Sequence, residues 1–215
     1  MGHITVLAGT NGAGKSSIGG EILRDNGEGT FYNPDEETRA IHARHPQMTP
    51  GEANSLAWRK GRELLERAIA EGKDYAFETT LGGTTITDML LQAAQSGRAT
   101  LHIWYCGLSS PELHIKRVQA RAAAGGHDIP EEKIRTRYDC SRMNVIKLLP
   151  HLTTLYLADN SIEQDLATGV RPRPAIVLSV QGKRIVYPGK ASELETTPQW
   201  AKPIVFKAIE LFGGG

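Results

Sequence analysis

Cysteine is scarce in this sequence, and the two that occur, Cys106 and Cys140, stand alone. Neither belongs to a CxxC pair or to a cluster with histidine, so the spacing gives no indication of a zinc site. Two ordinary thiols in a reducing compartment fit the pattern, because disulfide frameworks are typical of small secreted domains. We therefore expect a cytoplasmic protein that is stabilised by a hydrophobic core and has no disulfide bonds.

Long apolar runs and an excess of charge of one sign are also lacking. No apolar stretch approaches the roughly 20 residues that cross a bilayer, and the first residues lack the pattern of a secretory signal. Lysine and arginine number 25 against 24 aspartates and glutamates, which leaves a formal net charge of +1. Nucleic-acid binders usually carry a basic field. The balance argues against that class and against a membrane protein.

Short apolar runs alternate with longer helical patterns along most of the chain. This alternation predicts an α/β fold with a mostly parallel sheet. Strands are expected at 4–8, 31–33, 75–78, 101–106 and 154–158, and helices at 15–24, 50–71, 87–95, 111–124, 130–149 and 203–212. Residues 175–180 and 183–187 flank Gln181-Gly182, which indicates a hairpin. That hairpin could extend the edge of the sheet or pack beside it.

Residues Gly9–Ser16 match the phosphate-binding pattern G-x-x-x-x-G-K-[ST] in full. An apolar run precedes the motif and a helical pattern follows it, which is the context that the motif requires. Lys15 is expected to reach the β- and γ-phosphates of ATP, and the Ser16 hydroxyl to bind Mg²⁺. Ser17 is a weaker candidate, with a plain first-turn polar residue as its alternative. The expected ATP-binding residues of this segment are Gly9, Asn11, Gly12, Ala13, Gly14, Lys15, Ser16 and Ser17.

Two acidic residues follow expected strands, where the carboxyl ends of a parallel sheet form a ligand crevice. Asp35 comes after the second strand and could take a proton from a substrate hydroxyl. A turn residue or a helix cap is an equally good interpretation of Asp35 alone. Glu78 ends the third strand and is a candidate for a position near Mg²⁺ or the substrate. Thr80, just beyond it, could contribute a hydroxyl contact.

A basic region between 116 and 142 contains arginines at helical spacing. Arg117 and Arg121 lie four residues apart and so share one helix face. Gly125-Gly126 separates them from Arg137, which suggests two arginine-bearing helices joined by a hinge. Such a lid could close over ATP and place guanidinium groups on the transferring phosphate. A solvated basic helix face is the alternative.

Taken together, these motifs resemble the zeta-toxin family of P-loop kinases, especially its short chromosomal members. The resemblance covers about residues 3–165 in order. It rests on Gly9–Ser16, Asn33-Pro34-Asp35, His45-Pro46, Phe77-Glu78-Thr79-Thr80, the region from Arg117 to Tyr138, and Asp159-Asn160-Ser161.

The resemblance implies a three-layer P-loop kinase fold with a mostly parallel five-stranded sheet and a helical lid. The C-terminal β-hairpin is expected as an addition to this fold and is not part of the resemblance. Studied members phosphorylate the 3′-hydroxyl of the sugar in UDP-N-acetylglucosamine. Asp35 matches the family's catalytic base and Lys15 its phosphate-binding lysine. Glu78 and Thr80 match residues of the sugar-nucleotide site.

The lid and the nucleotide-base site are matched with fewer residues. Arg121 and Arg137 correspond to the two arginines that clamp the γ-phosphate. Arg117 is expected to contact ATP, and Asn160 to lie near the adenine. An antitoxin protein is a partner that the resemblance raises, although no antitoxin-like segment is visible in the chain.

One departure from the family concerns the acceptor. Larger toxins carry an arginine shortly after the acidic strand-end motif, where this chain has Gly82 and Gly83. This difference bears on the UDP-sugar substrate more than on the kinase chemistry.

We expect a P-loop kinase domain at 1–168, with its lid at about 117–142, and a C-terminal hairpin and helix at 169–215 packed on the same domain.

Three functions follow from these observations. The first is an ATP-dependent kinase acting on a hydroxyl of a small molecule, with UDP-N-acetylglucosamine as the leading substrate. The second is a nucleotide-dependent switch or binding ATPase without a phosphoryl acceptor. The third is a kinase of another metabolite or of nucleic-acid ends, and the neutral charge argues against nucleic acid.

Overall fold

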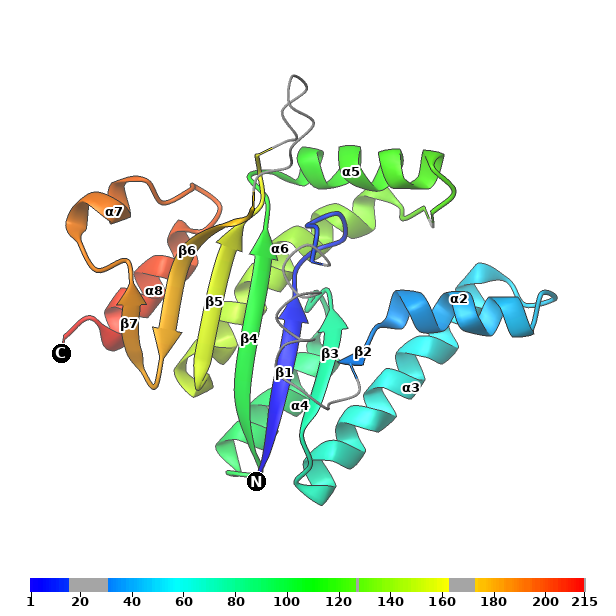
Figure 1. The fold of residues 1–215 in the computed structure, drawn as a ribbon, viewed down its shortest axis with the longest axis horizontal. Helices are drawn as coiled ribbons and strands as arrows, with labels where there is room; N and C mark the ends of the chain where they lie inside the picture. Colours follow the sequence, from blue (N-terminus) through cyan, green and yellow to red (C-terminus); the bar gives the residue numbers. More distant parts are fainter. Residues whose placement is uncertain (16–30, 127, 163–172, 215) are drawn as a thin grey trace.

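The computed structural model describes residues 1–15, 31–126, 128–162 and 173–214. Within these ranges the chain forms one seven-stranded sheet with the order β2-β3-β1-β4-β5-β6-β7 (Figure 1). The strands are β1 (Gly2–Ala8), β2 (Phe31–Tyr32), β3 (Tyr75–Thr79), β4 (Ala99–Gly107), β5 (Thr154–Asp159), β6 (Ala175–Gln181) and β7 (Arg184–Tyr187).

The sheet confirms the predicted fold class. Strands β2, β3, β1, β4 and β5 are parallel to one another. Strands β6 and β7 form the predicted hairpin, and β6 pairs antiparallel with β5. The hairpin therefore extends the sheet edge instead of packing beside it. The result is an α/β fold with a mostly parallel sheet, typical of P-loop nucleotide-binding proteins.

The helices largely match the predicted ranges. They are α2 (Pro34–Arg44), α3 (Pro50–Glu71), α4 (Thr84–Gln95), α5 (Pro111–Ala123), α6 (Glu131–Leu148), the 3₁₀ turn Leu149–His151, α7 (Ala191–Glu195) and α8 (Lys202–Phe212). The expected helix at 15–24 falls almost entirely on residues outside the described ranges. Among the described helices, none has the length and apolar character needed to cross a membrane.

Helix α3 has the sharpest boundaries in the sequence. The Thr49 hydroxyl accepts a hydrogen bond from the Glu52 backbone N–H at 3.3 Å, and a Glu52 carboxylate oxygen accepts one from the Thr49 N–H at 2.8 Å. This reciprocal pair is a capping box. At the other end Gly72 adopts a left-handed conformation with φ 64°. Glycine is favoured there because it has no Cβ to clash, so the chain leaves the helix at the predicted residue.

The main core lies on one face of the sheet. Figure 1 shows α4, α6 and α8 on the far side of the strands. Alternate residues of the central strands β1, β4 and β5 are apolar and fully buried, because successive side chains of a strand point to opposite faces. The strand side chains include Ile4, Val6, Leu101, Ile103, Leu155 and Leu157, and the helix side chains include Leu90, Val145, Leu148 and Val205. This packing fixes the carboxyl ends of the parallel strands, where the functional residues gather.

Candidate active site

The P-loop turns sharply at the carboxyl end of β1. Gly9 has φ 145° and Gly12 has φ 82°. A Cβ on Gly9 would lie 2.3 Å from the Cys106 carbonyl oxygen, and one on Gly12 would lie 2.7 Å from the His114 carbonyl oxygen. Only glycine fits these two positions, because both the backbone conformation and the close approach exclude a side chain.

Three buried side chains form hydrogen bonds with backbone carbonyls of the P-loop. His114 Nδ1 donates a hydrogen bond to the Asn11 carbonyl at 2.8 Å, while Asn160 Nδ2 and Cys106 Sγ donate to the Ala13 carbonyl at 2.8 and 3.0 Å. Burial lowers the pKa of His114 to about 4, so the ring is neutral near pH 7. Asn160 thus lies under the loop with 2% exposure. Its expected role near the adenine stays a prediction.

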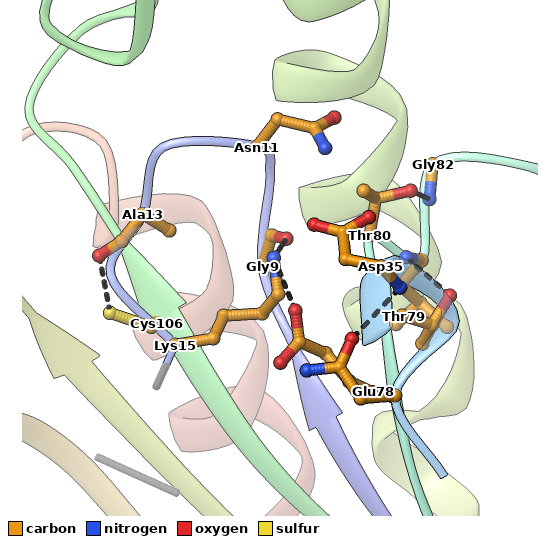
Figure 2. A network of polar contacts seen from close by, with 12 residues as sticks. Gly9, Asn11, Ala13, Lys15, Asp35, Glu78, Thr79, Thr80, Gly82 and Cys106 are labelled. Atoms are coloured by element: carbon orange, nitrogen blue, oxygen red, sulfur yellow. Dashed lines mark hydrogen bonds and ion pairs between the residues drawn. The ribbon is translucent and has the colours of Figure 1, made fainter. Parts of the chain in front are cut away.

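Lys15 lies at the bottom of the site, opposite Glu78. Its Nζ donates to the Gly9 carbonyl at 2.8 Å and lies 3.5 Å from Glu78 Oε1 (Figure 2). The two side chains are only 7% and 13% exposed. A buried ammonium beside the open glycine loop fits a polyanion such as a triphosphate. Ser16 and Ser17, the predicted magnesium ligand and its neighbour, lie outside the described residues.

Asp35 lies in the first turn of α2 and is not the residue that caps this helix. The Asn33 side chain accepts hydrogen bonds from the Asp35 and Glu36 N–H groups at 2.9 and 3.4 Å. Asn33 is therefore the helix cap, and the Asp35 carboxylate is not used for capping. It is 56% exposed, and its Oδ2 lies 3.7 Å from the nearest Arg121 guanidinium nitrogen.

The loop between β3 and α4 is shaped by helix α6. Leu81 is buried and has φ 51°, a left-handed conformation that is rare for leucine. Ser141 donates to the Thr80 carbonyl at 2.7 Å, and Asn144 donates to the Leu81 carbonyl at 2.8 Å. These bonds hold the strained turn. Sequence reasoning missed both supporting residues, and it also placed the start of α4 at Thr87, three residues after its observed start.

The three lid arginines occupy different places. Arg137, on α6, donates to the Asn11 side-chain oxygen at 2.7 Å and therefore lies against the P-loop. Burial lowers the pKa of its guanidinium from the ordinary value, and the charge of Asp35 opposes that shift. Arg121, on α5, lies beside Asp35. Arg117, one turn earlier on α5, donates to the Ile162 carbonyl at 3.5 Å.

A pocket of about 600 Å³ joins these elements. Its inner end consists of Asn11, Lys15, Glu78 and Arg137, around the P-loop. Its outer end consists of Asp35, Asn54, Trp58, Thr85, Ile86, Glu132 and Lys133, on the surrounding helices. Thr80 lies between the two ends. Within the described residues, Arg117, Arg121 and Asn160 do not line this pocket. The pocket brings together six of the predicted site residues: Asn11, Lys15, Asp35, Glu78, Thr80 and Arg137.

Magnesium would not need a cage of protein side chains here. Among the described residues, no group of three or more histidine, cysteine, aspartate or glutamate side chains is arranged to hold a metal ion. In kinase sites Mg²⁺ is typically held by one or two side chains together with phosphate oxygens and water. Ser16, the expected magnesium ligand, lies outside the described residues, so its role stays a prediction.

The loop, the parallel sheet and the acids at its strand ends define a P-loop kinase-like domain. The model of the family described as AAA domain matches residues 4–138. Because this match covers more than half of the chain, the protein belongs to that family. A relative from Haemophilus influenzae, described as an uncharacterized protein, is 29% identical over 130 residues, which is 60% of this chain and 88% of that protein.

Solved structures extend the likeness in fold. A chain of the AvrRxo1-ORF1:-ORF2 complex, solved with ATP, aligns with a TM-score of 0.63 and 17% identity over 93% of this chain and 64% of that one. A chain of the PezAT chromosomal toxin-antitoxin system of Streptococcus pneumoniae aligns with a TM-score of 0.54 and 16% identity, covering 100% and 80%. The present chain thus spans about two thirds of the AvrRxo1 chain, at 64%. At these identities the likeness shows the fold alone.

Proposed function

We propose that the protein is an ATP-dependent phosphotransferase that moves the γ-phosphate of ATP to a hydroxyl group of a small molecule. One observation carries the proposal: Lys15, Arg137, Glu78 and Asp35 line a single pocket beside the P-loop. A kinase needs cations on the phosphates and a carboxylate for the acceptor hydroxyl, and both kinds of group are present. The AAA domain match and the fold shared with an ATP-bound protein support ATP as the donor.

Asp35 is suited to the acceptor side of the reaction. In the proposed step, the acceptor oxygen forms a bond to the γ-phosphorus while the bond from that phosphorus to the β–γ bridging oxygen breaks, releasing ADP. The hydroxyl proton passes to the Asp35 carboxylate. That carboxylate is exposed to the pocket and is not used as a helix cap, so it is available to an incoming hydroxyl.

Lys15 and Arg137 are suited to the donor side. Lys15 is buried and Arg137 is partly buried, and charge stabilisation is stronger where water is excluded. Lys15 bonds to Gly9 and Glu78 in this structure, so we infer that the triphosphate replaces these partners when it binds. Mg²⁺, held by Ser16 and the phosphates, would neutralise charge on the β- and γ-phosphate oxygens.

The leading acceptor is UDP-N-acetylglucosamine. This follows from the resemblance to zeta toxins, and the fold shared with a chain of the PezAT toxin-antitoxin system supports it. Glu78 and Thr80, which the resemblance matches to the sugar-nucleotide site, both line the pocket. An antitoxin-like partner protein is a further part of this proposal. One similar structure is that of an ORF1:ORF2 complex, and the other comes from a toxin-antitoxin system.

A panel of hydroxyl acceptors with γ-labelled ATP tests the function directly. UDP-N-acetylglucosamine, free sugars, nucleosides and small alcohols are incubated with the enzyme and Mg-ATP, and labelled products are separated. The kinase proposal expects label in one class of acceptor. Tight ATP binding with only slow hydrolysis, and no labelled acceptor in any class, would instead identify a nucleotide-dependent switch.

A further inference from the structure

An aromatic side chain lines the outer end of the pocket and has no part in the phosphoryl-transfer step. Trp58 of α3 lines the pocket and is 45% exposed. Asn54 lies one helical turn earlier and lines the same pocket, because residues four apart share a helix face. An indole with an open face, next to an amide, forms a wall on the acceptor side of the site.

This wall is held in a fixed place relative to Asp35. The Tyr32 hydroxyl donates to the Ala57 carbonyl at 2.5 Å. A Cβ on Gly61 would lie 2.6 Å from the Tyr32 ring, so α3 lies directly against that ring. Tyr32 ends β2, three residues before Asp35 in the chain. The same tyrosine therefore anchors the helix that carries Trp58 and the strand that leads to Asp35.

A second contact fixes α3 against α2. Lys60 Nζ lies 2.9 Å from Glu37 Oε2, and Glu37 is in the first turn of α2 with Asp35. Together, the Tyr32 hydrogen bond and this ion pair hold α3 at Ala57 and at Lys60, close to Trp58 in the helix. Preorganised walls of this kind favour a rigid ligand, because little side-chain freedom is lost on binding.

The chemistry of the wall favours a flat ring with a polar edge. An indole stacks on any ring with a π face, and base–aromatic stacking is a strong, sequence-tolerant contact. The Asn54 amide presents a donor and an acceptor side by side, which matches the edge of a nucleobase. The charged residues at the outer end are Asp35, Glu132 and Lys133, two acids and one lysine, so this end does not favour an anionic group.

We propose that Trp58 and Asn54 form a subsite for a nucleobase of the acceptor, with Trp58 stacking on the ring and Asn54 binding its edge. The inference extends the proposed function and rests on it in one respect: it takes the bound ligand to be the phosphoryl acceptor. The adenine of ATP is expected elsewhere, since Arg117 and Asn160, the residues assigned to that side, do not line this pocket in the described part of the chain. Trp58 is thus assigned to specificity and not to the transfer step.

Nucleoside binding tests the subsite without any phosphoryl transfer. The full chain is saturated with Mg²⁺ and a non-hydrolysable ATP analogue, and the binding of labelled uridine, cytidine and adenosine is measured by equilibrium dialysis. We expect at least one nucleoside to bind, with its dissociation constant raised roughly 10-fold to 100-fold in Trp58→Ala and much less in Trp58→Phe. Asn54→Ala is expected to reduce the discrimination among the three bases.

The controls separate this proposal from the proposed function. Arg59→Ala changes the neighbouring exposed residue of α3, which is not in the pocket lining, and should bind nucleosides like the wild type. Unchanged nucleoside binding in Trp58→Ala overturns the subsite, as does a loss confined to the ATP analogue. Trp58-dependent binding of methyl glucoside without nucleoside binding overturns the base in favour of a sugar ring. Nucleoside binding that depends on Trp58 supports the subsite even if no acceptor is phosphorylated.

Discussion

The inner and outer ends of the pocket are built in different ways. At the inner end Lys15 and Glu78 are 7% and 13% exposed, and Lys15 donates a hydrogen bond to the Gly9 carbonyl of the P-loop. At the outer end Asp35 and Trp58 are about half exposed, at 56% and 45%, and project from helices α2 and α3. The inner end is thus buried against the P-loop. The outer end depends on side chains that can change without disturbing the sheet.

This contrast predicts that inner changes reduce transfer to every acceptor, while outer changes act on the acceptor alone. Asp35 belongs to the exposed outer end, but it has a chemical role in the proposed step. We expect Asp35→Asn to lower kcat by about 10²-fold to 10⁴-fold, the usual range for loss of a general base. ATP binding should be nearly unchanged. Both are measured with labelled ATP, by turnover and by equilibrium binding.

The control for Asp35 is its neighbour in the same helix turn. Glu36→Gln removes one negative charge from the same helix terminus but does not line the pocket. It should retain turnover close to that of the wild type. Full phosphoryl transfer by Asp35→Asn would show that another group accepts the proton.

Lys15 tests the inner end itself. Lys15→Ala should lower turnover by about 10²-fold to 10³-fold, the typical cost of removing one preorganised charge-stabilising group. The same factor is expected for each acceptor, because Lys15 is proposed to contact the phosphates and not the acceptor. Lys207→Ala, which removes a surface lysine paired with Glu210, is the matched control. A loss that differs strongly between acceptors would contradict the division into two ends.

Two adjacent glycines test how closely Arg137 must be placed. A Cβ on Gly82 would lie 2.7 Å from Arg137 Cγ, whereas a Cβ on Gly83 would have no atom within 4 Å. Gly82→Ala should therefore displace Arg137 and lower turnover by roughly 10-fold to 100-fold, since small misplacements in an active site are costly. Gly83→Ala should not. Equal turnover of the two variants would mean that Arg137 does not need its observed position.

Local motifs made much of this site predictable from the sequence. The P-loop is a run of eight consecutive residues, so its pattern needs no tertiary information. Asp35 and Glu78 could be found because residues after parallel strands gather at one edge of the sheet. Similarly, the boundaries of α3 follow from its capping box and from the glycine at its end. Each of these features is decided within a few residues of the chain.

The supporting residues could not be predicted in this way. Ser141 and Asn144 act on carbonyls 61 and 63 residues away, and His114 acts on one 103 residues away. Their side chains alone suggest ordinary helix residues, and only the packing of α5 and α6 over the loops gives them a partner. Trp58 shows the same limit. Its spacing marks it as an exposed position of α3, but the sequence does not show that this face borders the pocket.

His114 gives the smallest expected effect, and it distinguishes loop support from chemistry at the inner end. Burial is the main reason why its pKa is lowered to about 4, and the hydrogen bond to Asn11 opposes the shift. In the unfolded chain the pKa is about 6.5. Between these values the unfolded state binds a proton that the folded state does not, so the free energy of unfolding decreases as the pH falls. The expected loss between pH 7 and pH 5 is about 2 kcal/mol.

Urea unfolding of the wild type and of His114→Asn, whose amide can still donate to the Asn11 carbonyl, isolates this contribution from that of the carboxylates. The stability difference between the two proteins should change by this amount between the two pH values. Parallel losses in both would show that His114 does not resist protonation, and that the loop is held without a buried neutral ring.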